Sequence, residues 1–189
     1  MQSAHMKAQM KLQKVFVFTA LAAACLVFFY ALGFATDMYT LSFHADSTSK
    51  TFYVEGAELF YYIQPFNRIL LRDAVILLLL CVGLFATLTH RRRLYYASNY
   101  VASALYCAYA AYLAVFNLIN VNYIRALYLA LDFTRMQEIA EKLNMRFAKS
   151  TFMLDCGSVL TCLLIVSVLG LIANAVLKTV CMRRERNAA

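Results

Sequence analysis

The side chains best suited to acid–base or metal chemistry are few and lie far apart. The three histidines, His5, His44 and His90, fall in an N-terminal tail, a polar stretch and a basic turn. No HExxH, GxSxG or P-loop pattern is present. An enzyme acting on lipid at the membrane surface could use His44, Asp46 and Glu58, but their spacing sets no geometry. The sequence therefore predicts no catalytic residue, no metal site and no cofactor.

The six cysteines do not indicate redox chemistry or a disulfide framework. No CxxC pair is present, and four of the six lie within long apolar runs, at Cys25, Cys81, Cys107 and Cys162. Buried cysteines usually act as small packing residues. Cys181 precedes a basic cluster, where palmitoylation would fit, and the sequence leaves that modification open.

Four long apolar runs must position every one of these residues. They cover about residues 15–36, 69–90, 94–118 and 156–177. A hydrocarbon core about 30 Å thick needs roughly 20 apolar residues of helix to cross it. Hydrophobic residues make up 63% of the chain and charged residues 15%, where a soluble domain has roughly 25% charged. We therefore predict an all-α integral protein of the cell membrane, a four-transmembrane-helix bundle formed by one domain over residues 1–189.

Basic residues alternate between the ends of these runs and predict the orientation. One side would hold both termini and the cluster Arg91–Arg93, together with the lysines of the N-terminal tail and the arginines that follow the fourth run. Lys and Arg concentrate in short cytoplasmic loops, so both termini are expected in the cytoplasm. The net charge of +8 then reflects topology and contact with membrane lipids, and it predicts no nucleic-acid partner.

Two outer segments, at about residues 37–68 and 119–154, are expected to form a small cap. Residues 38–54 alternate like a β-hairpin. Thr134 to Gln137 fits a capping box that would begin an amphipathic helix of about 11 residues. Aromatic rings gather before the second run, where they could anchor the chain at the headgroups or bind another protein. As partner-binding anchors we expect Tyr61, Tyr62 and Phe66, followed by Phe52 and Tyr53.

The third run has two chemically different sides. Alanines, including Ala104, Ala108 and Ala111, recur on one side, where small residues would let a neighbouring helix of the bundle approach closely. Tyr106, Tyr109 and Tyr112 recur on the other. These tyrosines could pack between helices or could line a polar pathway.

Charged residues are expected at the outer ends of the runs and not at their middle. Arg72 and Asp155 could pair and lock the second run to the fourth. Alternatively, Arg72 extends to the headgroups and Asp155 complements the positive end of its own helix. Without a charge at mid-depth, no carrier for protons or cations is predicted.

These features favour a non-catalytic accessory or structural subunit. Such a protein would bind another integral membrane protein, or itself, through its spans and its outer cap. The alternatives are a small oligomeric transporter or channel that uses the tyrosine side of the third run, and an interfacial lipid-modifying enzyme.

Overall fold

The fold is an all-helical bundle in the part of the chain that the computed structural model describes, residues 4–36, 57–88, 93–142 and 149–187. Its helices are α1 (Ala4–Thr36), α3 (Ala57–Ala86), α4 (Arg93–Leu129), α5 (Phe133–Lys142) and α6 (Phe152–Asn187). The prediction of an all-α protein built on four long helices is confirmed. The expected hairpin over residues 38–54 lies outside the described residues.

Four of the helices are long and apolar enough to cross a membrane. The qualifying stretches are Lys7–Phe34, Tyr61–Ala86, Ala97–Leu129 and Phe152–Arg184. Each overlaps one of the four predicted runs, which supports a multi-pass membrane protein. The second stretch begins well before the predicted residue 69, because Pro65 lies inside α3 and does not end a preceding turn. Proline is tolerated in membrane helices when neighbouring groups satisfy the freed carbonyl.

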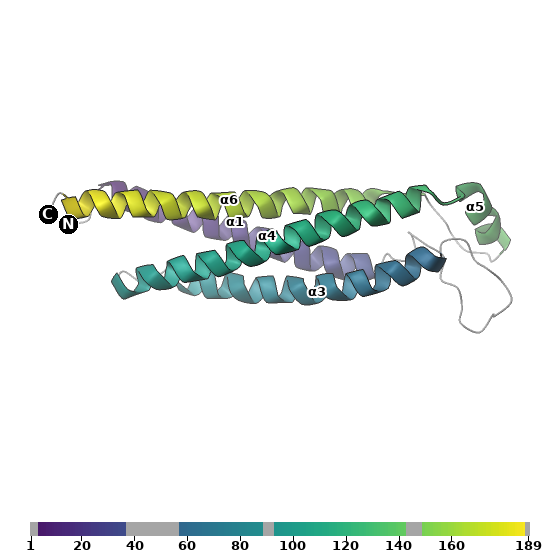
Figure 1. The fold of residues 1–189 in the computed structure, drawn as a ribbon, viewed down its shortest axis with the longest axis horizontal. Helices are drawn as coiled ribbons and strands as arrows, with labels where there is room; N and C mark the ends of the chain where they lie inside the picture. Colours follow the sequence, from purple (N-terminus) through teal and green to yellow (C-terminus); the bar gives the residue numbers. More distant parts are fainter. Residues whose placement is uncertain (1–3, 37–56, 89–92, 143–148, 188–189) are drawn as a thin grey trace.

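The four long helices form a ring in which each packs against two neighbours. The extensive contacts are α1 with α3, α3 with α4, α4 with α6, and α6 with α1, so that α3 and α6 lie across the bundle from each other. Figure 1 shows that α1 begins and α6 ends at the same end of the bundle, while α5 lies at the opposite end. We call these the terminal end and the α5 end.

The inside of the bundle is partly polar, and the outside is largely apolar. Buried residues recur every three or four positions, as expected for helices that pack side by side. On α1 the buried positions include Val17, Ala20, Ala24, Val27, Ala31 and Phe34. Buried polar side chains include Asn99, Asn117 and Ser167, whereas large apolar side chains such as Phe29 and Leu79 are exposed. This distribution suits a lipid surrounding better than water.

Side chains of α1 and α4 lie directly against two glycines of α6. A Cβ added to Gly157 would lie 2.5 Å from the Tyr30 hydroxyl and 3.0 Å from a Val121 methyl group. At Gly170 it would lie 2.8 Å from the Phe16 ring. The lack of a side chain at these two positions therefore allows α1, and in one case α4, to pack directly on the backbone of α6.

The amphipathic helix predicted in the second outer segment is present as α5. Its N-cap differs from the prediction, because the Asp132 carboxylate accepts hydrogen bonds from the amides of Thr134 and Arg135, at 3.1 and 3.2 Å. Asp is as good an N-cap as Ser or Thr and uses the same orphan amides. Met136, on the apolar side of α5, is fully buried.

Candidate functional site

An ion pair lies midway along the apolar stretch of α3. The Arg72 Nε donates to the Asp73 Oδ1 at 2.7 Å, and the Asp73 side chain is completely buried, while 64% of the Arg72 side chain is exposed. The stretch Tyr61–Ala86 is centred on these two residues. The pair thus lies inside the stretch that could cross a membrane, whereas the predicted start at residue 69 put it near the outer end of the span. Ionisable residues within a membrane span usually mark a functional position.

Helix α4 completes the environment of this pair. The Tyr112 hydroxyl donates to the Asp73 Oδ2 at 3.3 Å, so both carboxylate oxygens are bonded. Tyr109 stacks obliquely on Tyr112 with ring centroids 5.7 Å apart. Arg72 interacts electrostatically with both tyrosines. The site thus joins a guanidinium, a buried carboxylate and two phenols at the interface of α3 and α4.

The possible pair between Arg72 and Asp155 does not form. Asp155 instead accepts from Arg125 Nη1 at 2.7 Å, on α4, and from the Thr151 hydroxyl at 2.9 Å. Helices α3 and α6 lie across the bundle from each other, so these two side chains have different neighbours. Charge spacing in the sequence did not reveal which helices are adjacent.

The tyrosines predicted on one side of the third span have different surroundings. Tyr106 is fully buried, and its hydroxyl donates to the Ala20 carbonyl at 3.1 Å and lies 3.2 Å from the Ser167 hydroxyl. Tyr112 is 48% exposed. Tyr106 therefore connects α1, α4 and α6 in the core, whereas Tyr109 and Tyr112 belong to the Asp73 site.

The alanine side of the third span faces away from the bundle. Ala104, Ala108 and Ala111 are all exposed, and the buried side of α4 carries Tyr106, Ala110 and Leu113 instead. Ala108 and Ala111 therefore do not form the tight contact with another helix of the chain that was predicted, and Ala104 lies at the edge of a groove between α4 and α6. The helical period separated the two sides of α4 correctly but did not show which one the core contains.

The proposed aromatic anchors are only partly at the surface. Tyr61 is 60% exposed, but Phe66 is 3% exposed and packs against Phe34 and Phe116. The Tyr62 hydroxyl donates to Asn120 Oδ1 at 3.1 Å, and its ring lies against that of Tyr123. Phe66 is thus a core residue of this chain, which does not favour its predicted role as a partner-binding anchor. Phe52 and Tyr53 lie outside the described residues.

The residues considered for an interfacial enzyme are not brought together in the described structure. His44 and Asp46 lie outside the described residues. In the part of the chain that is described, no group of three His, Cys, Asp or Glu side chains gathers to hold a metal ion. The six cysteines are all free thiols.

A polar network crosses the bundle near its terminal end. The Lys178 Nζ donates to Asn99 Oδ1 at 2.9 Å, and the Asn99 amide donates to the Thr87 hydroxyl at 2.8 Å. One turn before Lys178 on α6, Asn174 accepts a hydrogen bond from Gln9 of α1 at 3.1 Å. Lys178 follows the fourth apolar run, where its charge would favour a place on the basic surface, yet its side chain is buried. Lys178 lies four positions after the buried Asn174, which lies three positions after the buried Leu171, and this helical spacing could have indicated its burial.

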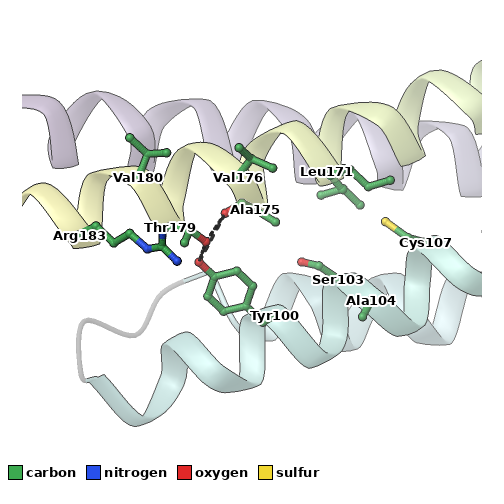
Figure 2. Close-up of a pocket in the computed structure, with 11 residues that line it drawn as sticks. Tyr100, Ser103, Ala104, Cys107, Leu171, Ala175, Val176, Thr179, Val180 and Arg183 are labelled. Atoms are coloured by element: carbon green, nitrogen blue, oxygen red, sulfur yellow. Dashed lines mark hydrogen bonds between the residues drawn. The ribbon is translucent and has the colours of Figure 1, made fainter.

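A groove lies beside this network, between α4 and α6. Its volume is about 490 Å³, and most of its lining is apolar. Tyr100 and Arg183 lie at its polar end, as Figure 2 shows. The Tyr100 hydroxyl lies 2.8 Å from the Thr179 hydroxyl, so α4 and α6 are bonded to each other there.

No protein-family model, curated protein or solved structure matches this chain.

Proposed function

We propose that this chain is a non-catalytic membrane subunit that binds another integral membrane protein, or a second copy of itself, through its spans. The observation that supports this most is the exposed guanidinium of Arg72 midway along α3. Exposed alanines on the neighbouring helix α4 add a surface that a further helix could approach closely.

The exposure of Arg72 argues for a covering partner. Charged side chains in hydrocarbon are costly, and nearly all face a bundle interior or a polar cavity. Arg72 bonds Asp73 through Nε, and its side chain remains mostly exposed. A partner helix that presents a carboxylate or an amide oxygen at this depth would bond the outer nitrogens. Extension of Arg72 to the headgroups is the competing arrangement.

The residues that flank Arg72 form a continuous surface on α3. Tyr61, Arg68, Val75 and Leu79 are also exposed and recur at helical spacing on the same side. Tyr61 is the predicted aromatic anchor that remains at the surface, so the proposed interface continues to the α5 end. On α4 the surface includes Ala108, Ala111 and Tyr112. The interface we propose thus combines two adjacent helices and one aromatic anchor.

Changing the alanine surface tests the proposal. Ala111→Leu and Ala108→Leu add bulk outside the core, so each variant is expected to fold normally but to lose its partner, because overpacking separates the two helices. The matched control is Ala173→Leu, which adds the same bulk at an exposed position of α6. The measurement is the stoichiometry of the complex purified from native membranes in mild detergent.

The purification experiment can support or contradict the proposal. Loss of a stoichiometric protein, or of the dimeric mass, in both α4 variants but not in the control supports the proposal. A complex retained by both α4 variants, or a wild-type protein that purifies alone as a monomer, contradicts it.

The transporter or channel alternative is favoured by one observation, the buried carboxylate of Asp73 midway along α3. A protonatable group at this position is what a proton or cation pathway requires. In that case Asp73→Asn would stop ion flux into vesicles reconstituted with the purified protein. The subunit proposal expects no flux from the wild-type protein alone.

We also propose that the terminal end faces the cytoplasm, on the distribution of Lys and Arg. Lys142 on α5 and Lys11 on α1 are both exposed and lie at opposite ends of the bundle. In a cysteine-free background, Lys142→Cys should react with an impermeant thiol reagent in intact cells, and Lys11→Cys should react only after lysis. The reverse labelling pattern would invert the topology.

A further inference from the structure

We propose that the groove between α4 and α6 binds a phospholipid with an anionic headgroup, whose acyl chain lies along the groove and whose phosphate contacts Arg183. This site is at the terminal end of the bundle and does not depend on the protein partner proposed above.

The groove has the size and lining of a lipid site. Its volume of about 490 Å³ falls in the range of roughly 300–1,000 Å³ typical of small-molecule pockets. Its walls are formed mainly by apolar side chains of α6 and small side chains of α4, namely Leu171, Ile172, Ala175, Val176, Val180, Ser103, Ala104 and Cys107. Ile172, Val176 and Val180 are exposed, so the groove opens sideways on the outside of the bundle.

Polar and positively charged groups are confined to one end of the groove. Figure 2 shows Arg183 reaching from α6 toward Tyr100 and Thr179. Tyr100 also accepts a cation on its ring, since the Lys178 Nζ lies 4.9 Å from the ring centroid. Two cationic side chains therefore lie near Tyr100, and none of the lining residues is acidic. An anion is the ligand that matches this end.

The apolar channel and the positively charged end of the groove together indicate the class of ligand. Arg183 lies at the end of the apolar stretch Phe152–Arg184, and in a helix that crosses a membrane this end would meet the headgroups. Arginine binds phosphate oxygens with paired hydrogen bonds, and an acyl chain fills an apolar channel. A free phosphate would occupy only the polar end of the groove. A partner helix about 10 Å wide would need an acidic side chain of its own to pair with the positive charge of Arg183.

Native mass spectrometry of the full chain in non-ionic detergent tests the polar end. Phosphatidylglycerol and phosphatidylcholine with identical acyl chains are titrated separately. We expect phosphatidylglycerol to bind more tightly and Arg183→Gln to weaken it about five-fold, which corresponds to about 1 kcal/mol. Phosphatidylcholine binding should change little. The matched control is Arg184→Gln, which removes the same charge from a neighbouring exposed residue outside the groove.

Filling the groove tests its apolar part. Ala104→Phe places a ring at the exposed edge of the groove and should reduce binding of both lipids, whereas Ala108→Phe, one turn away and outside the lining, should not. The proposal is contradicted if Arg183→Gln and Arg184→Gln weaken binding equally, or if Ala104→Phe binds phosphatidylglycerol like the wild type. It is also contradicted if Ala104→Phe changes only the oligomeric mass, because a second copy would then occupy the groove.

Discussion

Replacing Tyr106 by alanine will lower the free energy of unfolding by about 3–5 kcal/mol, as expected for removal of a large buried ring. Tyr106 is fully buried at the level where α1, α4 and α6 meet. The substitution leaves a cavity that three long helices cannot close by small shifts. It also removes the hydroxyl that bonds Ala20 and lies beside Ser167.

Two further variants separate the contributions of the ring and the hydroxyl. Tyr106→Phe keeps the ring and should cost about 1 kcal/mol, since Ser167 retains its bond to the Leu164 carbonyl. Tyr61→Ala removes the same side chain from an exposed position and should cost much less. The measurement is reversible unfolding in mixed micelles, followed by far-UV circular dichroism. If Tyr106→Ala is no less stable than Tyr61→Ala, the core described for α4 is wrong.

Neutralising Asp73 will destabilise the bundle more than neutralising any exposed acid. Asp73→Asn preserves size but removes the charge that pairs with Arg72 and weakens the acceptor of the Tyr112 hydroxyl. Because the carboxylate is completely buried, no solvent can replace these interactions. We expect the thermal midpoint to fall by about 4 °C or more.

The Asp155 pair provides the control for this effect. Asp155 also bonds an arginine, but its side chain is 54% exposed, so Asp155→Asn should change the midpoint little. Arg72→Leu combined with Asp73→Leu should recover most of the stability lost in Asp73→Asn, because neither charge then remains in the span. Equal shifts for Asp73→Asn and Asp155→Asn would show that Asp73 is not buried as described.

The four-helix architecture could be predicted from the sequence because each span contains its own signal. An apolar run such as Cys156–Leu177 is long enough to cross a bilayer whatever its neighbours are. The start of α3 could not be predicted in the same way. Gln64, Pro65 and Asn67 reduce the local hydropathy, although Asn67 is buried in the bundle. Because the sequence predicted that this helix begins near residue 69, it also predicted that Arg72 and Asp73 lie at the outer margin of the span.

The arrangement of side chains around the helices was less predictable. Periodicity separates the alanine side of α4 from its opposite side, but a membrane helix can turn either small or large residues inward. Tyr106 is buried because α1 and α6 supply partners for its hydroxyl. These partners, Ala20 and Ser167, are 86 and 61 positions away in the sequence. Pairing of Arg125 with Asp155 likewise depends on the order of helices around the ring, which no local pattern contains.

Light-activated cross-linking in intact membranes tests most directly whether the spans bind another membrane protein. A benzophenone amino acid is placed at Ala108, on the proposed interface, and separately at Ala173, on the exposed side of α6. We expect a discrete protein adduct from position 108, either another membrane protein or a second copy of this chain, and only lipid adducts from position 173. Lipid adducts alone from both positions would contradict the proposed interface.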